Sequence, residues 1–167
     1  KINFDFTPNG NDSQLIISSS GNTAVKGNLT VLDADGVMIG TSSLSEDSTE
    51  VYHSIAGNAD IHASYVNLSN SANGACVKGS LTVDADDVQI INESTTTAAL
   101  TGGTYQISTY DLNMRNHYGQ AVNGDITLFP DEDGSSNHTI YGATTGDLPV
   151  VQGNVVVNGS NLQVRNN

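Results

Sequence analysis

Residues 77–90 read VKGSLTVDADDVQI, two short runs of alternating apolar and polar side chains joined by a polar corner. In the first run, Val77, Leu81 and Val83 fall on one face, as in a strand with one buried side. The corner DADD consists of residues that favour turns, and Val88 begins the second run. Gly79 supplies a bend or a close backbone approach that a Cβ would block. The stretch therefore predicts a strand–corner–strand unit.

The same unit, φ-x-G-x-φ-x-φ-x(4)-φ-x-φ with φ apolar or aromatic, recurs along the chain. Its glycines are Gly27, Gly57, Gly79, Gly103, Gly124 and Gly153. The copy at Gly103 has Thr101 in the leading apolar place, and the copy at Gly124 resumes only at His138. Fixed internal repeats indicate stacked coils. We therefore predict an all-β, single-stranded parallel β-helix, a solenoid of about six right-handed coils, in residues 25–167.

Residues 1–24 are less regular, and we interpret them as N-terminal strands of a partial first coil. An antiparallel sandwich is the rival fold, because it also contains many short strands. One glycine-anchored motif in repeated copies argues against it. The third side of each turn varies in length, as loops on one side of a solenoid do. The one cysteine, Cys76, is expected in the core, so no intrachain disulfide forms.

The balance of charge excludes two classes of partner. The chain carries 5 Lys and Arg against 18 Asp and Glu, a formal net charge of −13. Nucleic acid and anionic membranes both require clustered Lys and Arg, so we expect neither as a partner. No stretch is long and apolar enough to insert as a transmembrane helix. An acidic surface favours solubility and the binding of cations.

Three phrases of the repeat resemble a known class of protein. They are VKGNLTV at residues 25–31, VKGSLTV at residues 77–83 and VQGNVVVNG at residues 151–159. These phrases resemble the GNLTV-NG repeats of bacteriophage tail fibres and related virion appendages. More loosely, they are similar to repeats of secreted filamentous-haemagglutinin-like adhesins. The resemblance covers the strand–corner–strand units and implies a stiff extracellular or virion rod, often oligomeric, that carries a receptor-binding surface.

The C-terminal end of the predicted solenoid lacks a cap. The last strand, residues 162–164, lies three residues from the end of the sequence. Solenoids need capped ends to stay soluble, and an exposed strand edge is a template for pairing. We therefore expect the open end to be covered by a partner subunit, by the rest of a longer polypeptide or by the next copy in a filament.

Acidic corners are the candidate metal sites. Asp33 and Asp35 lie in one corner, and Asp131, Glu132 and Asp133 lie in the insert of another copy. Calcium prefers six to eight oxygen ligands, many of them carboxylates. None of the corners contains the full twelve-residue calcium loop. Calcium is thus the only cofactor that we consider, and solvated turn carboxylates are the alternative.

Tyrosines give the candidate glycan site, because amphipathic rings suit sugar-binding surfaces. Tyr105 is at a core position, whereas Tyr118 and Tyr141 fall in predicted loops, the former beside His117 and Asn116. Ordinary loop packing is the alternative. The four histidines have no metal-binding spacing, so we expect them to be surface or partly buried structural residues.

These patterns favour a non-catalytic structural or adhesive solenoid, an extracellular or virion fibre subunit that displays variable loops to a surface or a glycan. A carbohydrate-binding module of a secreted bacterial protein, assisted by calcium, is the alternative. A polysaccharide lyase or hydrolase is a third class, because it uses paired carboxylates on similar folds, but fold does not imply function. We assign no catalytic residue.

Overall fold

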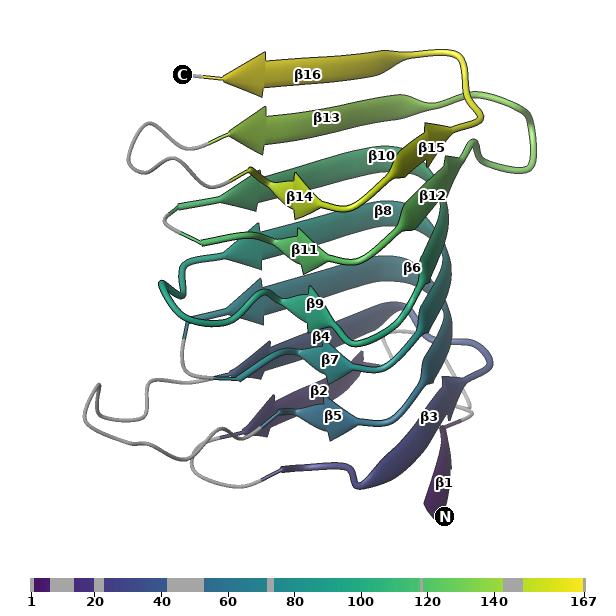
Figure 1. The fold of residues 1–167 in the computed structure, drawn as a ribbon. Coiled ribbons are helices and arrows are strands. Elements are labelled where there is room, and N and C mark those ends of the chain that lie inside the picture. Colours follow the sequence, from purple (N-terminus) through teal and green to yellow (C-terminus); the bar gives the residue numbers. More distant parts are fainter. Residues whose placement is uncertain are drawn as a thin grey trace.

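The alternating runs form strands that stack in parallel, coil upon coil (Figure 1). The computed structural model describes residues 2–6, 14–19, 23–41, 53–71, 74–117, 119–142 and 149–166. In these residues all regular structure is β, with no helix. The chain climbs from β1 to β16 in a right-handed sense (Figure 1). The protein is therefore a parallel β-solenoid, as the repeat predicts.

Two sheets make up the wall of the solenoid. The larger sheet contains β1 (Ile2–Phe6), β2 (Gln14–Ser19), β3 (Gly27–Val31), β4 (Gly36–Thr41), β6 (Ala59–Asn70), β8 (Leu81–Asn92), β10 (Tyr105–Asn116), β12 (Ile126–Phe129), β13 (Asn137–Gly142), β15 (Val155–Val157) and β16 (Leu162–Asn166). The smaller contains β5 (Ile55–Ala56), β7 (Val77–Lys78), β9 (Leu100–Thr101), β11 (Val122–Asn123) and β14 (Val151–Gln152). Its five strands correspond to about five turns. Strands β1 and β2 pair in parallel with β3 and β4, so they lie beneath the first of these turns.

The core consists of inward side chains that stack in columns, because each coil pairs in register with the next. One column contains Leu29, Ala59, Leu81, Tyr105, Ile126 and Val155. All of these except Val155, in the last coil, are buried. The expectations for Tyr105 and Cys76 are confirmed, since both are buried in this core. Burial raises the pKa of the Cys76 thiol to about 12, which leaves it uncharged and unreactive.

The corner does not interrupt the strands in the middle coils. We predicted one short strand on each side of the corner, whereas β6, β8 and β10 are each a continuous strand of 12 residues that passes through the bend. In β8, Ala85 points inward, Asp86 and Asp87 both point outward, and Val88 points inward again. Two consecutive outward residues turn the strand while its pairing to both neighbouring coils resumes beyond the bend. The polar pair thus marks a bend within a strand.

The copy at Gly103 differs from its expected register. Leu100, not Thr101, pairs with Val77 and Val122 and is fully buried. The prediction that Thr101 takes the apolar place was therefore wrong by one residue. Gly102, with a φ of 80°, accommodates the extra residue between β9 and the repeat glycine.

The repeat glycines lie directly above one another, which confirms the predicted close backbone approach. A Cβ on Gly57 would lie 1.9 Å from the carbonyl oxygen of Gly27, and a Cβ on Gly79 would lie 2.2 Å from that of Gly57. The residue that follows a repeat glycine forms a further hydrogen bond between neighbouring coils. Asn58 N–H donates to Asn28 Oδ1 (3.2 Å), and Ser80 N–H donates to Asn58 Oδ1 (3.0 Å). Side-chain oxygens therefore cap backbone amides at this edge of the coils.

Candidate functional site

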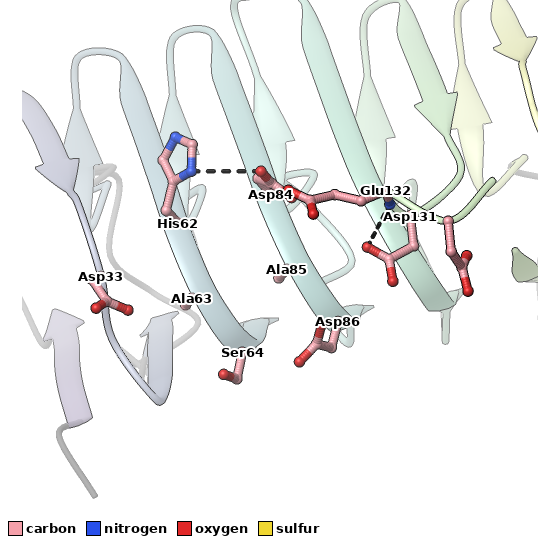
Figure 2. A pocket seen from close by; sticks show the side chains of 10 residues that line it. Asp33, His62, Ala63, Ser64, Asp84, Ala85, Asp86, Asp131 and Glu132 are labelled. Carbon is pink, nitrogen blue, oxygen red and sulfur yellow. Dashed lines mark hydrogen bonds and ion pairs between the residues drawn. The ribbon is translucent and has the colours of Figure 1, made fainter. Parts of the chain in front are cut away.

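An acidic groove runs along the corner side of the solenoid (Figure 2). Its volume is about 490 Å³, and the corners of three coils and the loop between β12 and β13 line it. The lining residues are Asp33, His62, Ala63, Ser64, Asp84, Ala85, Asp86, Asp131, Glu132 and Asp133. Asp33 lies at one end and Asp131 at the other (Figure 2). The solenoid thus gathers carboxylates from corners far apart in the sequence.

The loop at residues 130–136 is held by its own hydrogen bonds. Gly134 N–H donates to the carbonyl oxygen of Asp131 (2.8 Å), and Glu132 N–H donates to Asp131 Oδ1 (2.8 Å). The hydroxyl and the N–H of Ser135 both donate to Asp133 Oδ1. These two hydrogen bonds lower the pKa of the Asp133 carboxyl below its ordinary value. Asp133 therefore stays ionised at neutral pH.

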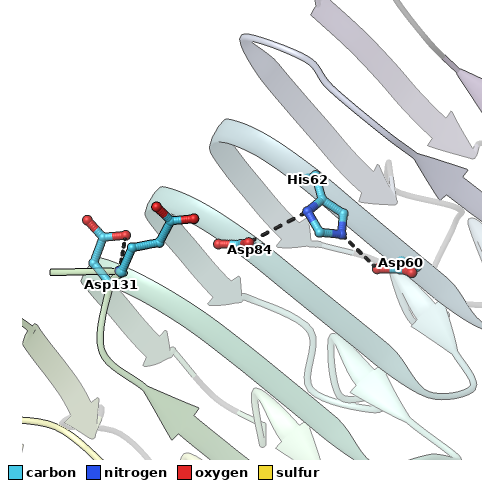
Figure 3. A network of polar contacts seen from close by, with 5 residues as sticks. Asp60, His62, Asp84 and Asp131 are labelled. Carbon is cyan, nitrogen blue, oxygen red and sulfur yellow. Dashed lines mark hydrogen bonds and ion pairs between the residues drawn. The ribbon is translucent and has the colours of Figure 1, made fainter. Parts of the chain in front are cut away.

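His62 lies between two carboxylates at the rim of the groove (Figure 3). Its Nε2 is 3.5 Å from Asp60 Oδ1, and its Nδ1 is 3.6 Å from Asp84 Oδ2. All three side chains are about half exposed, so water screens these contacts and each stabilises the fold little. The intervening coil separates the Asp33 and Asp84 corners, as the repeat register predicts.

The carboxylates of the groove do not converge as a metal centre would. In the described part of the chain, no group of three or more His, Cys, Asp or Glu is placed to hold an ion. Four of the five expected calcium ligands, Asp33, Asp131, Glu132 and Asp133, line the groove, whereas Asp35 does not. The groove therefore offers a diffuse negative surface, and calcium binding stays a prediction.

The fold places Tyr141 beside Arg115, the residue before Asn116 and His117, so these residues of the expected glycan site lie on, or directly after, adjoining strands. Tyr118 lies outside the described residues, and His117 is exposed just after β10. Tyr141 is in strand β13 and not in a loop, because the insert at residues 130–136 takes up the extra length before it. Asn116 is only 6% exposed. The expectation that Tyr141 falls in a loop was therefore wrong, and Asn116, proposed as a glycan-binding residue, is buried.

Asn116 belongs to an internal asparagine ladder. It is in register with Asn92, which is in register with Asn70. Asn70 Nδ2 donates to Asn92 Oδ1 (3.0 Å), and Asn92 Nδ2 donates to the carbonyl oxygen of Gln120 (2.6 Å). Stacked amides of this kind form hydrogen bonds with one another and with backbone carbonyl groups of the turn that follows the strand. The signal in the sequence is an asparagine two residues after the last inward apolar residue in the three copies that contain β6, β8 and β10.

His53, which is partly buried, and His138, which is buried, have structural contacts. His53 Nδ1 accepts a hydrogen bond from Ala75 N–H (2.9 Å), and burial, followed by the charge of Lys78, lowers the His53 pKa. His138 is completely buried, deeper than we expected of any histidine. Its Nε2 lies 2.9 Å from the carbonyl oxygen of Thr109. Because a carbonyl only accepts, Nε2 carries the proton.

A second feature of the outer surface, a tyrosine in register between two arginines, was not identified from the sequence. Arg115 is in register with Tyr141, and Tyr141 is in register with Arg165. The signal was available, because each of these residues follows an inward apolar residue by one position. It was hidden because the repeat pattern places no constraint on outward positions.

Comparisons of the chain with protein-family models, with curated proteins and with solved structures found no match. Among the described residues there is no helix that could cross a membrane.

Proposed function

We propose that this chain is a non-catalytic β-solenoid that attaches to a surface, as a subunit or domain of an extracellular or virion fibre or adhesin. The observation that supports this most is the contrast between its interior and its corner. Inward side chains are apolar in nearly every coil. The sequence of the corner, in contrast, differs from coil to coil: it is His62–Ser64 in one, Asp84–Asp87 in the next and the insert at residues 130–136 in a later one. A rigid scaffold with variable connections is the usual way to build a recognition surface.

The hydrogen-bonding groups on the wall support attachment to a glycan. A shallow groove of about 240 Å³ crosses the outward faces of β3, β6 and β8. Its polar lining residues are Asn28, Thr30, Asn58, Asp60, Ser80 and Thr82. Amides and hydroxyls in rows suit the hydroxyls of a sugar chain. A carbohydrate-binding module of a secreted protein has the same requirement and remains our alternative.

A panel of immobilised glycans, probed with the whole chain with and without calcium, tests this proposal. We expect one or more glycans to be retained and no sugar to be released from them. Binding that disappears with a chelator would support the calcium-assisted module. Release of reducing or unsaturated sugar would instead make the chain a polysaccharide-cleaving enzyme and would refute our proposal. Failure to bind any glycan would refute its attachment part.

End-on association is the second part of the proposal. Val155, Leu162 and Val164 continue the inward columns in the last coil, yet they are 40%, 37% and 69% exposed. A parallel coil of a second copy would bury them in the same columns and pair with the free edges of β15 and β16. Light scattering should then show assemblies of the whole chain that Val164→Asp dissociates. A wild-type chain that is monomeric at high concentration would contradict this part.

A further inference from the structure

The outward face of β10, β13 and β16 carries a column of three side chains, which we call the Arg–Tyr–Arg column. Arg115 pairs in register with Tyr141, and Tyr141 pairs in register with Arg165. The three strands lie side by side at the C-terminal end of the solenoid (Figure 1). Both arginines are exposed and the tyrosine is partly exposed. Side chains in register on neighbouring strands begin about 4.8 Å apart, so the Tyr141 side chain leaves the sheet between those of Arg115 and Arg165.

This column is a local concentration of positive charge on a strongly acidic chain. The sequence contains only five Lys and Arg, and two of them flank this one tyrosine. Neither arginine forms an ion pair with a carboxylate within the described ranges. Arg165 donates to Gln163 Oε1. Their charges are therefore available to an anion from solution.

On the same three strands the column has polar, uncharged neighbours, and on the adjoining coil Glu93 follows by two residues the Ile91 that pairs with Arg115. The neighbouring outward column consists of Asn113, Thr139 and Gln163, which are also in register. On β10 the preceding outward carboxylate is that of Asp111, four residues before Arg115 and thus about 13 Å away along the strand. Charges further apart than about 10 Å are largely screened at 0.1 M salt. The acidic corner therefore does not cancel the positive charge of the column.

We propose that the Arg–Tyr–Arg column binds a linear glycan through the carboxylates of its uronic acids. A guanidinium group binds a planar carboxylate with two parallel hydrogen bonds. An aromatic ring packs against the apolar face of a sugar, and the column of Asn113, Thr139 and Gln163 supplies donors and acceptors for hydroxyls. This inference rests on the attachment function proposed above, and it names the class of glycan.

Spacing selects among acidic glycans. Arg115 and Arg165 are two strands apart, so their side chains begin about 9.6 Å apart along the axis of the solenoid. A carboxylate on every second sugar of an extended chain repeats at a similar distance, roughly the length of one disaccharide. An alternating polymer of a uronic acid and a neutral sugar, lying parallel to the axis, therefore places a carboxylate on each arginine and a neutral sugar on the Tyr141 ring.

The test compares oligosaccharides of matched length on the whole chain. We would titrate a hyaluronan octasaccharide, which alternates glucuronate and N-acetylglucosamine, against a neutral N-acetylglucosamine oligomer and a sulfated oligomer without carboxylates. Binding would be measured by calorimetry at several salt concentrations. We expect hyaluronan to bind best and its affinity to fall with salt. Equal or tighter binding of the neutral or sulfated oligomer would overturn the inference.

Variants locate the site. Arg115→Gln and Arg165→Gln should each weaken hyaluronan binding about tenfold, because each removes a charged hydrogen-bonding pair. Tyr141→Phe should bind as wild type does, since it keeps the ring, and Tyr141→Ala should not. Lys78→Gln is the matched control, because Lys78 is an exposed cation on the smaller sheet. The unfolding temperature of each variant, measured alongside, identifies any that fails to fold.

The outcomes separate this inference from the proposed function. If hyaluronan or another glycan binds but the two arginine variants bind as wild type does, attachment stands and the column is wrong. If the glycan panel shows no binding of any class, the attachment function itself fails. Loss of hyaluronan binding in both arginine variants, with Lys78→Gln unchanged, supports the column.

Discussion

Replacing Gly57 by alanine is expected to force two coils apart. An ideal Cβ at this position would lie 1.9 Å from the carbonyl oxygen of Gly27 and 2.4 Å from its carbonyl carbon. Real Cβ atoms essentially never come closer than 3.0 Å to another atom. The partner is backbone, which cannot rotate away as a side chain can. The two coils would therefore separate by roughly 1 Å at this point.

The hydrogen bonds beside Gly57 determine the size of the effect. Val25 N–H donates to Ser54, Ala56 N–H donates to Val25, and Leu29 N–H donates to Asn58, each with a donor–acceptor distance of 2.9 Å. A distance stretched by roughly 1 Å is no longer a hydrogen bond, and each lost bond costs about 0.5–1.5 kcal/mol. The free energy of unfolding should fall by about 2–4 kcal/mol. That corresponds to a decrease in Tm of roughly 5–15 °C for a chain of this size.

Gly134→Ala is the control that isolates backbone strain from lack of space. Gly134 has a φ of 80°, yet no atom lies within 4 Å of its ideal Cβ. Alanine there costs only the left-handed conformation, about 1 kcal/mol. Urea unfolding followed by circular dichroism would compare the two variants with wild type. If Gly57→Ala loses no more stability than Gly134→Ala, close packing of the glycine column is not what positions the coils.

Three further predictions concern pH, the asparagine ladder and like charges. The pKa of His53 is lowered below its ordinary value of 6.5, so the unfolded chain binds more protons than the folded chain between the two pKa values. The contribution of His53 to stability should therefore be complete above pH 6.5 and decrease as the pH falls through this window. His53→Asn keeps an acceptor for Ala75 N–H and should remove this pH dependence in Tm measurements. Asn92→Ala should lower the free energy of unfolding by about 2–4 kcal/mol, because it leaves buried partners unsatisfied, whereas the exposed Asn113→Ala should change it by less than about 0.5 kcal/mol in the same urea titrations. Asp87 and Asp111 are like charges in register on neighbouring coils. Asp111→Asn should therefore have a higher Tm than wild type at low salt, and this difference should disappear at high salt. A lower Tm for the variant at low salt would contradict the expected repulsion.

The stack of coils could be predicted from the sequence because two independent signals agree. Alternation with a period of two selects the buried face, and a slip of one residue would expose all of it. The repeat glycine sets the same register again in each copy. Where the two signals disagree, prediction failed: at Gly103 the glycine places Thr101 inside, whereas the buried residue is Leu100, because Gly102 adds one residue between them.

The lateral surfaces could not be predicted in the same way. The acidic groove combines Asp33 with Asp131, almost a hundred residues apart, and its shape depends on how the loop at residues 130–136 folds over neighbouring corners. Tyr141 was assigned to a loop because a long insert precedes it, and the sequence does not show where such an insert ends. Asn116 carried a signal in its repeat position, but asparagine is equally typical of exposed turns.

The separation of interior and surface also explains how the fold tolerates its own charge. The inward columns and the backbone hydrogen bonds between strands hold each coil to the next. An outward column therefore contributes little to stability, and like charges can lie in register there. Asp111 in register with Asp87 is one such column, whereas the imidazole of His62 lies between the carboxylates of Asp60 and Asp84. The Arg–Tyr–Arg column also has no part in the core. Its two guanidinium groups lie at the spacing that the coils impose, which is why a ligand with a matching repeat is the natural one to test.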